Sequence, residues 1–146
     1  MIGVSVSRDK FTSNLGKKVA DAQHNRLRDA RDKGFAFSQE VVPEDRGTLR
    51  QRGFATVDRT DGSYIWGYAA PQAAPMEFGT EPGHTPPLQP LLEWSERVSD
   101  GPGLGYYVAL EKIPREGVSA QPFVRPGAEV SKRFLRNHSL NDYLDI

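Results

Sequence analysis

The chain has 146 residues and a mass of 16.2 kDa, which suits one domain with a single modest core. Its 19 basic and 19 acidic residues cancel, so overall charge gives no indication of a protein that coats nucleic acid. The absence of cysteine excludes disulfides, thiolate metal sites and cysteine nucleophiles.

The N-terminal part of the chain predicts one long helix. Residues 1–7 are expected to form an extended arm, and Ser7 is a suitable N-cap for a helix of about seven turns that ends near Gly34. The helix is predicted by apolar residues at intervals of three and four: Phe11, Leu15, Val19, Ala22, Leu27 and Ala30. Eight basic residues against four acidic ones between Arg8 and Lys33 make this segment mildly basic.

A β-hairpin is predicted to follow the helix. Pro43–Gly47 is typical of a turn, and the aromatic and β-branched runs Phe54–Thr60 and Ser63–Ala69 are typical of strands. Asp61 and Gly62 between them predict a type I′ turn. Four apolar residues before the turn are expected to be buried: Phe35, Phe37, Val41 and Val42.

Most of the 11 prolines and many of the 14 glycines lie in the second half of the chain, where long loops are therefore expected. Gln72–Phe78 is predicted to form a short helical turn, and Leu91–Val98 a short helix. Gly79–Pro90 and Gly101–Gln121 are predicted to be loops or arms, since proline removes amide donors and glycine loosens the backbone. Within the second loop, Tyr106–Ile113 fits either a strand or a helix.

A short helix is predicted near the C-terminus. Pro126 stands where proline is favoured at the first helical position, and Val130, Phe134 and Leu135 supply the apolar face, before a polar tail at 136–146. The sequence therefore predicts a single α+β domain over residues 1–146, in which a long N-terminal helix packs on a small antiparallel sheet centred on the hairpin. A short C-terminal helix and two long Pro/Gly-rich loops complete it.

The residues give little support for an enzyme. His24, His84 and His138 show no HExxH, HxH or other metal-binding spacing, and surface solvation accounts for them better. The chain has no GxSxG motif and no phosphate-binding loop. Acidic pairs such as Glu77 with Glu81 are more often solvated or capping groups than acid/base pairs. We therefore predict no catalytic residue, no metal site and no cofactor.

The sequence predicts a soluble protein. Its first residues lack the pattern of a signal peptide, and no run approaches the roughly 20 apolar residues of a membrane span. We therefore expect a protein that is kept in a cytoplasm or packed into an assembly built there, with no membrane partner.

Two kinds of binding are compatible with the residues. The basic first helix with Arg46, Arg50 and Arg52 suits weak contact with a phosphate backbone, although ordinary surface charge explains them equally simply. Stiff Pro/Gly arms rimmed by aromatic residues suit contacts with neighbouring subunits, because proline lowers the entropy lost on docking. The same aromatics also suit the chain's own core: Phe78, Trp94, Tyr106 and Phe123.

Three short boxes, in order, resemble the small neck or tail-completion proteins of long-tailed double-stranded DNA viruses of bacteria and archaea. The resemblance spans about Phe11 to Leu135, with two departures: Arg46 stands where that family usually has threonine, and the link before the second box is longer. The first box is Pro43, Gly47, Leu49 and Arg50; the second is Tyr68, Ala69, Glu77, Phe78, Gly79 and Thr80; the third is Pro122, Phe123, Val124, Pro126 and Gly127.

The resemblance implies a non-catalytic structural protein of the virion, assembled in the host cytoplasm. It would form a ring, expected to be a hexamer, at the head-tail junction, and DNA would pass through the ring without sequence specificity. Its partners would be copies of itself and other neck, connector and tail-terminator proteins. The near-zero net charge suits a lumen that must not bind DNA tightly.

The resemblance also suggests where contacts lie. The arms Gly79–Pro90 and Gly101–Gln121 are candidates to reach a neighbour. The interface candidates are Glu77, Phe78, Gly79, Thr80, Pro86, Pro87, Pro122, Phe123 and Arg125, and the DNA-lumen candidates are Lys17, Lys18, Arg46 and Arg50. Alternatives are a tail terminator or a head-side connector ring, a basic nucleic-acid-binding module, and a small defence or toxin-type enzyme.

Overall fold

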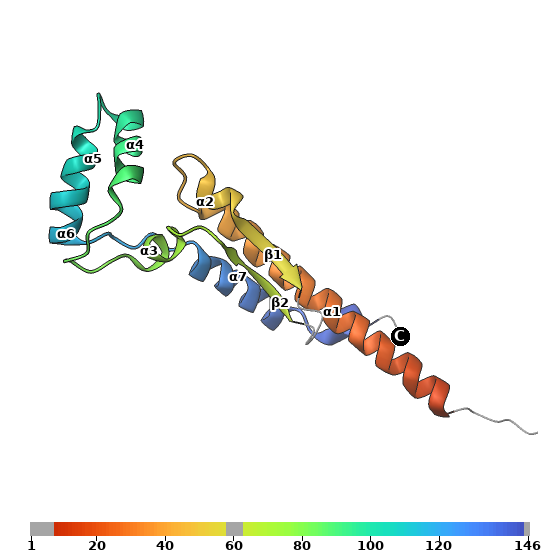
Figure 1. The fold of residues 1–146 in the computed structure, drawn as a ribbon. Helices are drawn as coiled ribbons and strands as arrows, with labels where there is room; N and C mark the ends of the chain where they lie inside the picture. The colour runs from red at the N-terminus through yellow and green to blue at the C-terminus, as the bar shows by residue number, and fades with distance from the viewer. Residues whose placement is uncertain (1–7, 58–62, 145–146) are drawn as a thin grey trace, which may run out of the picture.

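The structure, a computed structural model, describes residues 8–57 and 63–144 (Figure 1). It is rich in helix and carries a small antiparallel sheet, which confirms the predicted α+β class. Figure 1 shows an elongated molecule in which the long helix α1 runs beside α7 and the sheet, while α4, α5 and α6 project at one end. The predicted arm at residues 1–7 and the N-cap Ser7 lie outside the described residues.

Helix α1 (Arg8–Val41) does not end near Gly34, as the sequence predicted, but continues for two more turns. Its buried residues recur every fourth position through the glycine, at Ala30, Gly34, Ser38 and then Val42 just beyond the helix. This periodicity defines one continuous packing face. Gly34 therefore serves close packing inside the helix instead of stopping it.

Helix α7 (Val124–Asn137) lies antiparallel along α1 and covers that face (Figure 1). The two backbones meet at Gly34 and Gly127, where a Cβ atom added to Gly127 would lie 2.6 Å from the carbonyl oxygen of Gly34. Further along, the Ser131 hydroxyl donates to the carbonyl of Ala30 at 2.7 Å. Pro126 is the third residue of α7, not the first as predicted. This position still lies in the first turn, whose backbone amides have no acceptor within the helix, so proline is tolerated there.

The predicted hairpin is confirmed as β1 (Gly53–Val57) and β2 (Tyr64–Tyr68), paired antiparallel with Gly53 opposite Tyr68 and Val57 opposite Tyr64. These strands form the one sheet found in the described residues. The predicted type I′ turn at Asp61-Gly62 lies outside those residues.

The main core forms where the end of α1, the sheet and the start of α7 meet. Val42, Leu49 and Phe123 are buried there, and the ring of Tyr68 contacts that of Phe123 edge-on at 4.9 Å between centroids. Leu49 lies on the short helix α2 (Thr48–Gln51), after the predicted turn. Burial of Phe37 and Val41 was predicted wrongly, because the continued α1 places both on its outer face.

Residues 88–116, here called the helical hairpin, pack on one another and project from the body (Figure 1). The predicted loop at Gly101–Gln121 is wrong for residues 103–116, and Tyr106–Ile113 is helical. Glycine and proline suggested a loop, but Gly105, Ala109 and Ile113 are buried at every fourth position, and the first two lie on elements that pack against α4. The elements are α4 (Leu88–Val98), α5 (Gly103–Tyr107), the π-helix η1 (Val108–Lys112) and α6 (Ile113–Glu116).

The C-terminal residues are more ordered than the predicted polar tail. A 3₁₀ helix, η2 (Leu140–Tyr143), is closed by a capping box between Ser139 and Asp142. The Tyr143 hydroxyl donates to the Asp29 carboxylate on α1 at 2.8 Å. This contact holds the segment after α7 against the long helix.

Candidate functional site

The second and third boxes of the sequence meet at Glu77, near the end of α3 (Ala73–Phe78). Its side chain is buried, with the residue only 3% exposed. The carboxylate accepts hydrogen bonds from the backbone amides of Phe123 at 2.7 Å, Val124 at 2.8 Å and Arg125 at 2.9 Å. These amides open α7 and have no partner within the helix. Glu77 therefore caps α7 from a distant part of the chain, with its negative charge at the positive end of the helix dipole.

Arg125 completes this contact from the solvent side. Its Nε donates to the Glu77 carboxylate and its guanidinium also donates to the Glu77 backbone carbonyl, both at 2.9 Å. The guanidinium lies 5.4 Å from the centroid of the Phe78 ring. The side chain of Arg125 is 57% exposed, so its ion pair is partly screened by water.

The pKa of Glu77 reflects these contacts. Burial raises the pKa, but the three backbone amides and Arg125 together outweigh burial and hold it below the ordinary value of 4.5. A carboxylate whose pKa is lowered by folding stabilises the fold fully above its unfolded pKa, and this contribution is lost as pH falls through the lower, folded pKa.

We therefore expect unfolding free energy to fall below about pH 4.5. The variant Glu77→Gln cannot ionise at this position, so its free energy of unfolding should fall less over the same pH range. The difference in stability between the wild type and the variant should therefore shrink as pH falls. Urea unfolding at several pH values between 7 and 3 measures this. Parallel acid-stability curves for both proteins would contradict the assignment.

The segment after Glu77 turns sharply and is fastened to the chain's own 114–118 region. Gly79 has φ of +72°, and a Cβ atom there would lie 2.5 Å from the carbonyl oxygen of Val118, so this turn requires glycine. Thr80 pairs with Val118 through backbone bonds, and its hydroxyl accepts from the Val118 amide at 3.0 Å. The Gly83 amide donates to the carbonyl of Pro114 at 2.7 Å. Residues 79–87 of the first predicted arm therefore lie outside any helix or strand and are anchored at both these points, but the prediction is wrong for residues 88–90, which form the first turn of α4.

The predicted interface residues divide into an inner and an outer set. Glu77 and Phe123 are buried within the chain, Arg125 binds Glu77, and Gly79 and Thr80 form the turn. Phe78, in contrast, is 69% exposed beside a shallow apolar hollow lined by Tyr68, Ala73 and Ala74. The prolines are exposed or half-buried at the edges of helices: Pro86, Pro87 and Pro122.

The four DNA-lumen candidates do not form one cluster. Lys17 and Lys18 are exposed near the start of α1, whereas Arg46 and Arg50 lie beyond its end. Lys17 and Val41 lie 24 positions apart on α1, which is about 36 Å at the helical rise. Arg46 and Arg50 also form ion pairs at 3.5 Å, with Glu93 and Glu44 respectively.

Two ion pairs join the helical hairpin to the body. Asp45 pairs with Arg97, and Arg46 pairs with Glu93, so that the turn before α2 faces α4. These contacts could not be predicted from the sequence, because the partners lie about fifty residues apart along the chain.

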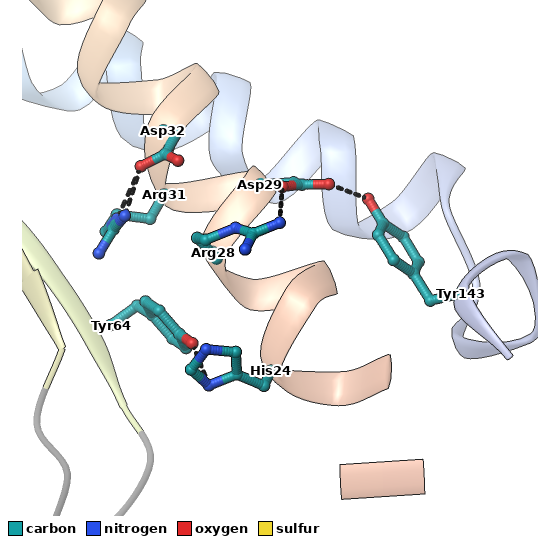
Figure 2. A network of polar contacts seen from close by, with 7 residues as sticks. All are labelled: His24, Arg28, Asp29, Arg31, Asp32, Tyr64 and Tyr143. Atoms are coloured by element: carbon teal, nitrogen blue, oxygen red, sulfur yellow. Dashed lines mark hydrogen bonds and ion pairs between the residues drawn. The ribbon is translucent and has the colours of Figure 1, made fainter. Parts of the chain in front are cut away.

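A polar network on α1, also not expected from the sequence, connects it to the sheet and to η2 (Figure 2). His24 hydrogen-bonds the hydroxyl of Tyr64 on β2, and Arg31 lies 5.2 Å from the centroid of the same ring. The Asp29 carboxylate forms an ion pair with Arg28 and accepts a hydrogen bond from the Tyr143 hydroxyl. His24 is exposed, as predicted, but is bonded to Tyr64 and not merely solvated.

Over residues 8–57 and 63–144, no group of three or more histidine, aspartate or glutamate side chains is placed to hold a metal ion. In the same residues no helix is both long and apolar enough to cross a membrane. Comparisons with protein-family models, with curated proteins and with solved structures found no match.

Proposed function

We propose that this protein is a non-catalytic subunit of a ring at the head-tail junction of a long-tailed DNA virus, where it joins the tail to the capsid connector and lets DNA pass. The observation that carries this proposal is the exposed apolar surface of the helical hairpin. Val98, Tyr106, Tyr107 and Leu110 are each between 45% and 56% exposed, on an element that projects from the body. Large apolar side chains exposed on a projecting element are typical of a protein-protein contact.

The Glu77 contacts support the resemblance on which the viral assignment rests. The Glu-Phe-Gly-Thr box supplies the carboxylate, and the Pro-Phe box supplies the amides that it binds. The two boxes are thus one structural unit split by more than forty residues. Their joint occurrence has a physical reason, which makes a chance match of short motifs a poorer explanation.

The geometry favours an assembly protein over a nucleic-acid-binding module. Two of the four predicted DNA contacts are paired with carboxylates of the same chain, and the other two lie far from them. A positive patch that follows a phosphate backbone requires adjacent, available cations.

The purified protein, alone or with isolated tails of its virus, is expected to form rings visible by electron microscopy and as a discrete large species by light scattering. A strictly monomeric protein at high concentration and in the presence of tails would contradict the proposal. A map locating the ring against tail-tube or capsid-side subunits would separate a neck ring from a tail terminator or head-side connector.

A further inference from the structure

A second apolar surface without a partner in the described structure lies at the opposite end of the molecule from the helical hairpin. Residues 14–20, here called the α1 extension, precede Ala22, and all of them are exposed. Leu15 and Val19 are 40% and 36% exposed and share one face of the helix, four residues apart. Figure 1 shows this end of α1 running on beyond the sheet.

The helical hairpin carries a matching surface. Tyr106 and Leu110 are also four residues apart, with Tyr107 beside them, and all three face away from the buried contact with α4. A stripe of two apolar residues on one helix and an aromatic-aliphatic stripe on another suit helix-on-helix packing.

The charges of the two surfaces are complementary. The α1 extension contains Lys17 and Lys18 and no acidic residue. Between Leu88 and Glu116 the hairpin has five acidic and three basic residues, a net charge of −2, and Glu111 directly follows Leu110. Opposite charges around an apolar contact favour association and disfavour pairing of like surfaces.

We infer that the α1 extension of one subunit packs on the helical hairpin of the next, with Leu15 and Val19 against Tyr106 and Leu110. The two surfaces lie at opposite ends of one elongated chain, so they cannot meet within it and must join different copies (Figure 1). Such a head-to-tail contact is heterologous, and it closes into a ring when the rotation between subunits permits. This inference rests on the proposed ring and names its contact.

The test uses Leu15→Glu and Leu110→Glu, each of which disables one half of the contact. Both sites are exposed, so folding should be retained, which circular dichroism and thermal unfolding verify. Each variant alone should lose ring formation, with self-association weakened by about tenfold or more, since a buried leucine contributes that much. Ile65→Glu is the matched control, because Ile65 is exposed at 47% on the sheet, outside both surfaces, and rings should persist.

Mixing the two variants gives the decisive result. The Leu15→Glu copy keeps an intact helical hairpin, and the Leu110→Glu copy keeps an intact α1 extension. These two intact surfaces can join one copy of each variant, and the mixture should form 1:1 dimers that cannot grow because the remaining two surfaces are disabled. Labelling one variant with ¹⁵N lets native mass spectrometry identify the mixed dimer.

Three results would overturn the inference while leaving the proposed ring intact: rings from either variant alone, dimers of one variant with itself, or a monomeric mixture although the wild type forms rings. Failure of the wild type to form rings, alone or with tails, would overturn both the proposed function and this contact.

Discussion

Replacing Glu77 with alanine is expected to lower the free energy of unfolding by about 3–5 kcal/mol, a large part of the stability of a domain of this size. The substitution leaves three amides at the start of α7 without their acceptor, that of Phe123 buried and those of Val124 and Arg125 partly buried, and each unsatisfied buried group costs about 1–3 kcal/mol. It also removes a charge that interacts favourably with the helix dipole. The melting temperature should fall by roughly 10 °C.

Two variants separate the contributions to this loss, measured by urea unfolding at neutral pH. Arg125→Ala removes the exposed half of the ion pair and should cost no more than about 1 kcal/mol, because that guanidinium is mostly in water. Glu77→Gln keeps an oxygen acceptor, so its loss of unfolding free energy should lie between those of Arg125→Ala and Glu77→Ala. Equal losses for Glu77→Ala and Arg125→Ala would show that the ion pair, and not the capping of α7, carries the stability.

Replacing Gly127 with alanine is expected to destabilise the protein by about 1–3 kcal/mol, although alanine is the better helix former by about 1 kcal/mol. A Cβ atom there would lie 2.6 Å from the Gly34 carbonyl oxygen, 2.7 Å from the Trp66 ring and 2.9 Å from the Ser38 Cβ. Contact on three sides leaves no direction for relaxation, so α1 and α7 must move apart.

Gly16→Ala is the control for that result. Gly16 lies in α1, the helix that α7 packs against, and an added Cβ atom there would meet nothing within 4 Å. Helix propensity alone then acts, and the variant should be unchanged or stabilised by up to about 1 kcal/mol. In thermal unfolding, Gly127→Ala should lower the melting temperature, whereas Gly16→Ala should leave it unchanged or raise it. Stabilisation by Gly127→Ala would mean that α1 and α7 are not held at the distance described.

The sequence was most informative where local periodicity decided the structure. Helix α1 was predicted from the spacing of its apolar residues, and the β-hairpin of β1 and β2 from its β-branched and aromatic runs. The short helix α3 was likewise predicted from neighbouring residues. The end of α1 was not predicted, because a glycine can either end a helix or pack closely inside one, and the packing partners of Gly34 lie on α7. The helical hairpin was missed because glycines and prolines mark loops locally, whereas Gly105 is needed for close contact with the Leu91 carbonyl.

The role of Glu77 could not be predicted from its surroundings. The resemblance marked Glu77, Phe123 and Arg125 as important, and their proposed use was contact with a neighbour. In the structure they bind one another instead. An acidic residue next to a turn is usually solvated, and only the arrival of the α7 amides from far along the chain makes its burial favourable.

The antiparallel pairing of α1 with α7 has a consequence for how the protein folds during synthesis. Ala30 and Ser131 are joined across 101 residues of chain, so α1 leaves the ribosome well before its partner. At about 5–20 residues per second this delay is roughly 5–20 seconds, during which the face of α1 that will be buried stays open to solvent. A nascent chain that stops early cannot cover this face. Chains truncated before α7 are therefore expected to expose this face and to be degraded or bound by chaperones.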